Sequence, residues 1–246
     1  MNLKLKINTI LIFFILSGCD SSDSYFPLKK SSILHYNILS TTDGFSKTKS
    51  KQTYTVIDVR GNRSVVLGNS GQVISYLFEK DGIKREDINY IDMEYIINFD
   101  GSLKIYKNFD LPSEKLDNER DHYVIKFPLE IGTSWSIEDM TRLKMTIGYD
   151  RVFETWLPFK LTNKIVSKNE RVRIKNKIYK NCIKVVGKGN TSYNAGPPIG
   201  VINITIENID WYAPGIGLVK TVRSERSDSE TMGELFTEKY YEENEI

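Results

Sequence analysis

Alternating apolar and polar residues dominate the chain from residue 33 onward and predict β-strands. In the first half the alternating segments are short, rich in β-branched and aromatic residues, and separated by glycine-containing turns. We predict strands at 33–39, 53–59, 64–67, 72–80, 93–99 and 102–106. The pairs Gly61-Asn62, Asp81-Gly82 and Asp100-Gly101 favour tight turns, because glycine tolerates a positive φ. This spacing of turns indicates an antiparallel meander rather than strands alternating with helices.

The second half continues the alternation in longer segments, predicted as strands at 142–153, 157–167, 201–211, 218–224 and 231–241. Stretches that are polar or rich in glycine, at 40–52, 107–121 and 187–198, are typical of loops. The apolar run Trp156-Leu157-Pro158-Phe159 is expected at a corner of the core. The predicted fold class is mainly β. Residues 25–241 form a single domain of antiparallel meander strands in a curved sheet, half-barrel or sandwich, with little helix outside the signal peptide. Residues 242–246 form an acidic tail that frays.

The N-terminus departs from this pattern, because residues 7–16 form an unbroken apolar run. Two lysines precede the run and two small residues follow it, which is the arrangement of a secretory signal peptide. A membrane-spanning helix needs roughly 20 residues, so the run is too short to be one. The segment Leu16-Ser17-Gly18-Cys19 resembles the lipobox of bacterial lipoproteins. The resemblance implies that residues 1–18 are cleaved, that Cys19 is lipidated and that residues 19–24 form a polar tether.

Lipidation of Cys19 would fix the domain to a membrane on its extracytoplasmic side. One acyl chain gives only marginal binding, at about 0.8 kcal/mol per buried methylene, so a di- or triacylated cysteine is needed for a stable anchor. Membrane lipid, contacted through acylated Cys19, is therefore the predicted partner in the bacterial cell envelope. Asp20 resembles the inner-membrane retention signal of enterobacterial lipoproteins, but the choice between inner and outer membrane stays open. The alternative is a soluble secreted protein with a cysteine near its cleavage site.

Net charge argues against a nucleic-acid-binding protein, and the position of the second cysteine argues against a reactive thiol. Without Lys4 and Lys6 the chain has 32 basic and 32 acidic residues, so it lacks the net positive charge of a nucleic-acid-binding protein. The second cysteine, Cys182, lies in a segment where alternate residues are apolar. We expect it to be a buried strand residue rather than a reactive thiol.

Two further motifs lie in the β-rich part of the chain. They are Phe-Pro-Leu-x-x-Gly-x-x-Trp at 127–135 and Trp-Tyr-Ala-Pro-Gly-Ile-Gly-Leu-Val-Lys at 211–220. Together they resemble a loose group of uncharacterised bacterial β-rich lipoproteins, which implies a curved antiparallel sheet and no known activity. Phe-Pro-Leu also occurs at 26–28, which indicates either an internal duplication or two similar strand starts.

The segment 168–177 is the most basic in the chain. On one strand its cations would share a face, opposite three apolar side chains. The cations are Arg171, Arg173, Lys175 and Lys177, and the apolar residues are Val172, Ile174 and Ile178. One interpretation is attraction to anionic lipid headgroups beside the tether. The preferred one is the solvated face of an edge strand, where lysines prevent sheet-to-sheet association.

No residue spacing points to catalysis. The two histidines, His35 and His122, are far apart in the sequence, and neither has the spacing of a metal-ligand motif. The glycine-rich segment 187–198 lacks the ending of a phosphate-binding loop. We therefore predict no catalytic residue, no metal site and no cofactor, and the ligand-binding residues stay unassigned.

Three functional hypotheses remain. The first is a non-catalytic structural or interaction module of the envelope, with another envelope protein as partner. The second is a carrier that holds a lipid or other apolar ligand within a curved sheet. The third is an envelope hydrolase. The first two differ in the sheet interior, because a carrier leaves part of it unfilled whereas a structural module packs it solid.

Overall fold

The computed structural model describes residues 25–26, 28–42, 47–88, 95–97, 103–105, 122–147, 151–197, 199–229 and 235–242. Within these residues the strands form a large antiparallel sheet of twelve and a separate pair, β6 with β7. The predicted fold class is thus confirmed. The strands are β1 (Ile33–Thr42), β2 (Thr48–Arg60), β3 (Arg63–Gly68), β4 (Val73–Glu79), β5 (Gly82–Ile88), β6 (Tyr95–Ile97), β7 (Leu103–Ile105), β8 (His122–Lys126), β9 (Ser134–Ile147), β10 (Arg151–Ile174), β11 (Lys177–Asn194), β12 (Val201–Ala213), β13 (Gly217–Ser227) and β14 (Leu235–Glu242).

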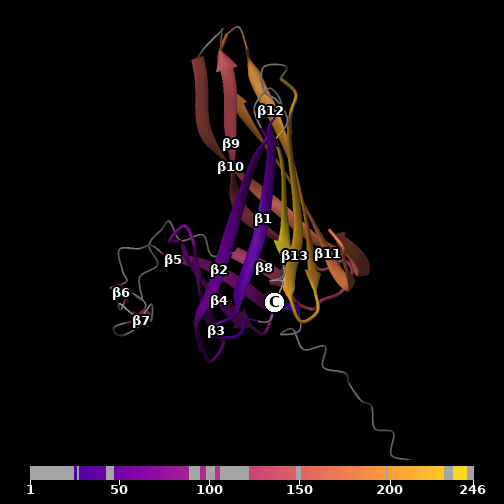
Figure 1. Ribbon diagram of the computed structural model, residues 1–246. Helices are drawn as coiled ribbons and strands as arrows, with labels where there is room; N and C mark the ends of the chain where they lie inside the picture. The colour runs from indigo at the N-terminus through magenta and orange to yellow at the C-terminus, as the bar shows by residue number, and fades with distance from the viewer. Residues whose placement is uncertain are drawn as a thin grey trace, which may run out of the picture.

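The large sheet curls into a nearly closed, barrel-like shape (Figure 1). Its order is β8-β5-β4-β3-β2-β1-β14-β13-β12-β11-β10-β9. The edge strands β8 and β9 are consecutive in the chain, so residues 127–133 lead directly from one edge to the other. The indole N–H of Trp135 on β9 donates to the carbonyl of Tyr123 on β8 at 2.9 Å. The two edges therefore meet at this junction without a continuous ladder of backbone hydrogen bonds between them.

Most of the predicted strands and turns are present, but the segment predicted as one strand at 142–153 is divided between β9 and β10, which pair antiparallel. Gly61 and Gly71 both have positive φ in turns that join consecutive antiparallel strands. The clearest alternation, in β12, buries every second residue up to Ile206. The predicted strand at 231–241 is observed as β14, which extends to Glu242, one residue into the segment expected to fray.

Two predicted loops are shorter than expected. β1 continues to Thr42 and β2 starts at Thr48, so most of 40–52 is strand. β11 continues to Asn194, so the prediction of a loop from 187 was wrong. Its glycines reflect close packing instead. A Cβ on Gly189 would lie 2.6 Å from the Phe159 ring, and one on Gly187 would lie 2.3 Å from Asn163 Oδ1. Glycine within a strand commonly marks such close approach.

The apolar run at 156–159 is part of the continuous strand β10 rather than a core corner. Leu157 and Phe159 are buried, whereas Trp156 is 58% exposed on the opposite face. The strand continues through Pro158, whose carbonyl accepts a hydrogen bond from Thr191 on β11.

Two hydrophobic clusters fill separate parts of the interior. One contains Phe26, Leu129 and Trp135, so both Phe-Pro-Leu segments contribute to the same cluster. The other packs β9, β10 and β12 together through leucine, phenylalanine and isoleucine side chains. The two similar strand starts are thus observed, while an internal duplication stays a hypothesis.

The outer end of the β10–β11 hairpin, residues 167–182, is called the hairpin tip below. Register shifts in β10 between Ile165 and Val172 interrupt its pairing with β11. Such bulges bend a strand. The tip packs its buried residues, Val172, Ile174, Tyr179 and Cys182, against Ala213 and Val219 of β12 and β13.

The prediction that the basic residues share one strand face was partly wrong. The chain turns at Lys175-Asn176, so Lys177 already belongs to β11. Arg171 and Arg173 are exposed opposite buried Val172 and Ile174, as expected. Ile178, expected among the buried residues, is 44% exposed. The turn reverses which residues of the second strand point outward.

Residues 1–24, including Cys19, and the charged segment 107–121 lie outside the described residues. Among the residues that are described, no helix has the length and apolar character to cross a membrane.

Candidate ligand-binding cavity

A cavity of about 350 Å³ lies inside the barrel-like sheet. Its lining comes from nearly every strand of the large sheet and includes Phe26 and Tyr212 of one hydrophobic cluster and Leu161 of the other. The cavity therefore lies between the two clusters. The inward-facing side chains at this level do not meet, and the interior is not packed solid.

Apolar side chains cover much of the wall. They come from the N-terminal segment and from strands on several sides of the sheet. The members are Phe26, Leu28, Leu34, Ile38, Val66, Val124, Ile137, Leu161, Ile216 and Leu218. Their spread around the wall means that an apolar group in the cavity would be surrounded by protein, as is usual for small-molecule sites.

Four of the five tyrosines in the lining form a second part of the wall. Tyr36, Tyr54, Tyr76 and Tyr212 project from β1, β2, β4 and β12. Burial raises the pKa of Tyr76 to about 12 and raises those of the other three, so all four hydroxyls stay protonated at neutral pH. The Tyr36 hydroxyl donates to the carbonyl of Leu218 at 3.1 Å. The group thus offers aromatic surface and neutral hydrogen-bonding groups.

Lys239 on β14 brings a cation into this aromatic group. Its ammonium lies 4.4 Å from the centre of the Tyr36 ring and 5.0 Å from that of Tyr54, within cation–π range. It donates to the Gln52 side chain at 2.9 Å. Burial, together with the nearby charge of Arg85, lowers the pKa of Lys239 to about 8. Among the described residues, Lys239 forms no ion pair.

Asp210 on β12 is the acidic counterpart. Burial raises its pKa to about 6, although hydrogen bonds from Thr221 and Asn208 favour the carboxylate. The Asn208 amide donates to it at 2.9 Å. Lys239 also lowers this pKa by its charge, although the two groups form no direct ion pair in the described structure.

The two arginines of the cavity are already paired. Arg85 Nη2 lies 2.8 Å from Asp87 on its own strand. Arg223 on β13 reaches across the interior, with Nη1 2.7 Å from Asp139 on β9 and Nε 2.6 Å from Glu225. The Arg223 guanidinium also lies 5.4 Å from the centre of the Phe159 ring. This cross-interior contact links β13 to β9.

The arrangement suits a ligand that has both an apolar part and a polar group. The arginine charges are satisfied by neighbouring carboxylates, whereas Lys239 and Asp210 retain bonding capacity toward the cavity. Lys239 can donate to an oxygen of the ligand, and Asp210 can accept from a hydroxyl or amine. In the described residues no group of three or more His, Cys, Asp or Glu is placed to hold a metal ion.

The residues singled out in the sequence lie apart from one another. Cys182 is fully buried at the base of the hairpin tip, where burial raises the pKa of its thiol to about 11. This confirms the expectation of a buried strand residue. His35 hydrogen-bonds Thr53 on the outside of the sheet, whereas His122 lines the cavity.

Sequence reasoning missed the charged cavity residues. In β12 the parity that buries Ile202, Ile204 and Ile206 continues through Asn208, Asp210 and Tyr212. A polar residue on the inward parity of a strand is a signal that could have identified Asp210. No comparable signal in the sequence identifies which residues of the other strands lie near Asp210 in the cavity.

Neither a family model nor a curated protein matches the chain. Solved structures that resemble it include a predicted lipoprotein from Parabacteroides distasonis, with 13% identity, coverage of 88% of this chain and 97% of that one, and a TM-score of 0.38. A predicted exported protein from Bacteroides fragilis with a YmcC-like fold has 12% identity, coverage of 87% and 97%, and a TM-score of 0.39. The hypothetical lipoprotein YmcC from Escherichia coli has 6% identity, coverage of 86% and 85%, and a TM-score of 0.31. TM-scores of this size do not establish a shared fold.

Proposed function

We propose that this protein is a lipid-anchored, non-catalytic protein of the bacterial envelope that binds a small ligand inside its barrel-like sheet. The ligand has an apolar part and one polar group. This proposal corresponds to the carrier hypothesis raised by the sequence. We prefer it to the hypothesis of a structural or interaction module, because such a module would have a solidly packed interior. The lipobox supports the anchor.

The unfilled interior is the observation that favours binding. A volume of about 350 Å³ is within the range of small-molecule sites, roughly 300–1,000 Å³. Aromatic and aliphatic side chains around the cavity would bury the apolar part of a ligand. Lys239 and Asp210 would bind its polar group and fix its orientation.

Filling the cavity tests the proposal. The probe is 1-anilinonaphthalene-8-sulfonate, which combines aromatic rings with one anionic group and fluoresces when bound in apolar surroundings. Val66 is buried and lines the cavity, so the larger side chain of Val66→Phe should fill part of the volume that the probe would occupy. We expect this change to weaken probe binding by at least about tenfold, which is about 1.4 kcal/mol. Fluorescence titration of the purified full-length protein measures the change.

The matched control is Val201→Phe, which makes the same change at a side chain that is 58% exposed. This variant should bind the probe within about twofold of the wild type, since its replacement lies outside the cavity. Circular dichroism checks that each variant is folded, and Ile38→Phe, also in the lining, replaces Val66→Phe if that variant is not. Equal binding by a folded cavity variant and the control would refute an interior site.

The anchor has a separate test. Cys19→Ala should abolish incorporation of labelled palmitate and move the protein from the membrane to the soluble fraction, because the thiol that carries the acyl chains is lost. Cys182→Ala is the matched control, and it should leave labelling and fractionation unchanged because Cys182 is fully buried. Labelling that persists in Cys19→Ala would contradict the lipobox assignment.

A further inference from the structure

The outward face of the hairpin tip combines positive charge with an exposed apolar side chain. Arg173 is paired in register with Ile178, so these neighbours lie on the same side of the hairpin. Arg171 and Lys180 are exposed on the same two strands, whereas Val172 and Tyr179 are buried underneath. Ile178 is therefore exposed beside Arg173, on a hairpin that also exposes Arg171 and Lys180.

These cations are not neutralised. Among the described residues, Arg171, Arg173 and Lys180 form no ion pair. Lys175, at the turn, is held by Glu242 of β14 at 2.5 Å, and Lys177 lies over the Tyr179 ring. Glu170 is the one acidic residue in the sequence from 167 to 182, against six lysines and arginines. A few scattered lysines are enough to stop an edge strand from pairing with the sheet of another molecule. The outward face of the hairpin tip carries more positive charge than this protection requires.

The hairpin tip also lies where the domain begins. The Tyr25 hydroxyl donates to the carbonyl of Asn181 at 3.1 Å, which fixes the start of the domain against the tip. Tyr25 is six residues beyond Cys19. Six residues span at most about 22 Å even when fully extended. An acylated Cys19 would therefore hold the hairpin tip close to the bilayer surface.

From these observations we infer that the hairpin tip docks on anionic lipid headgroups of the membrane that holds Cys19. Arg171, Arg173 and Lys180 contact the headgroups, and Ile178 enters the interfacial region between them. The inference rests on the proposed anchor but not on the ligand-binding cavity. Docking would orient the barrel-like sheet relative to the bilayer instead of leaving it free at the end of a tether.

Tryptophan quenching tests the docking. The lipidated full-length protein with Ile178→Trp is reconstituted into vesicles of brominated phosphatidylcholine, with or without 30% phosphatidylglycerol. Bromine quenches only a tryptophan that reaches the lipid, so quenching beyond that of the parent protein should appear on the anionic vesicles and be lost in 0.5 M NaCl. Val201→Trp, exposed on β12, is the matched control and should give no added quenching.

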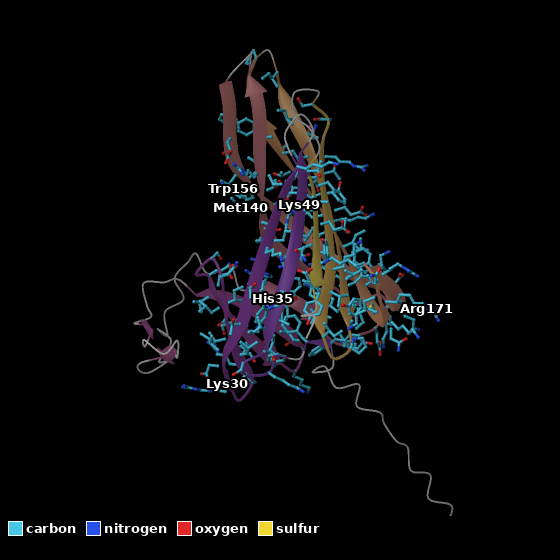
Figure 2. The ribbon with its side chains drawn as sticks, in the orientation of Figure 1. Lys30, His35, Lys49, Met140, Trp156 and Arg171 are labelled. Atoms are coloured by element: carbon cyan, nitrogen blue, oxygen red, sulfur yellow. The ribbon has the colours of Figure 1, made fainter. Side chains whose placement is uncertain are left out.

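Charge reversal tests the three cations. Each charge near an anionic surface favours association about fivefold, so Arg171→Glu, Arg173→Glu and Lys180→Glu together should weaken docking at least about 100-fold and abolish the quenching of Trp at position 178. The control reverses Lys49, Lys160 and Lys188, which are exposed elsewhere on the sheet, and it should retain quenching. Figure 2 shows Lys49 well away from Arg171. If the glutamate variant does not fold, the three glutamine replacements serve instead.

The outcomes separate the docking from the anchor. A protein without labelled palmitate that does not remain with neutral vesicles would refute the anchor and with it the docking. A palmitoylated protein that stays on the vesicles but shows no added quenching would refute the docking alone. Equal quenching on neutral and anionic vesicles, or quenching that survives charge reversal, would overturn the role of the cations.

Discussion

Lys239 lies among aromatic rings in the interior, where a charged ammonium loses most of its hydration. The two tyrosine rings and Gln52 replace part of that hydration, but Arg85 repels the ammonium from β5. Asp210 on β12 attracts it without forming an ion pair. The balance leaves the pKa of Lys239 at about 8, below its ordinary value of 10.5. The Lys239 ammonium, which has no carboxylate partner among the described residues, can therefore still donate a hydrogen bond to a ligand.

This pKa predicts a pH dependence of stability. Between pH 8 and 10.5 the folded protein has lost the proton that the unfolded chain still binds, so stability rises with pH in that window. Below pH 8 both states are protonated and the burial penalty is present in full. The free energy of unfolding of the wild type should therefore rise relative to Lys239→Met by up to about 3 kcal/mol from pH 8 to 10.5.

Urea denaturation at several pH values measures this difference. Comparison with Lys239→Met cancels the titration of the buried tyrosines, which both proteins share. Lys160→Met, an exposed lysine on β10, controls for the loss of one lysine. A difference in the free energy of unfolding between the wild type and Lys239→Met that stays constant from pH 7.5 to 10.5 would contradict a desolvated ammonium at position 239.

At the scale of elements, the sequence predicted strands best where one face is buried and the other solvated. β12 is the clearest case, because Ile202, Ile204 and Ile206 are buried on the inward parity while the residues between them are exposed. The prediction failed in β11, whose glycines resemble a loop in sequence. Those glycines are needed because side chains of β10 lie against the β11 backbone. Contact with a neighbouring strand is not encoded in the local pattern.

The hairpin tip shows a second limit of the local pattern. A one-residue difference in where a turn falls reverses the faces of everything after it. The turn at Lys175-Asn176 has no glycine or proline to mark it, and Lys175 adopts a positive φ of 50°. The basic face was predictable for Arg171 and Arg173, whereas the exposure of Ile178 required the observed turn. The cavity was still less predictable, because its lining comes from strands brought together only by closure of the sheet.

Closure of the sheet is a property of the whole molecule. A curved sheet with twelve described strands could remain open, with β8 and β9 as exposed edges. Instead, the chain passes from one edge to the other within residues 127–133, and Gly132 and Thr133 form backbone hydrogen bonds with Ile165 of β10. Trp135 adds a hydrogen bond and a buried ring at the junction. The cavity, and hence the proposed binding site, depends on this junction, which closes one side of the sheet.

Trp135→Phe tests its contribution, because phenylalanine keeps an aromatic ring but removes the indole N–H. The carbonyl of Tyr123 would lose its donor, so we expect a loss of about 1–2 kcal/mol in the free energy of unfolding and faster hydrogen exchange of β8 amides. Trp156→Phe makes the same change at an exposed site and should alter stability by less than about 0.5 kcal/mol. Since the junction closes one side of the cavity, Trp135→Phe should also weaken binding of 1-anilinonaphthalene-8-sulfonate, while Trp156→Phe should not. Equal stability and equal exchange in the two variants would show that the sheet stays closed without this hydrogen bond, through the connection at 127–133 alone.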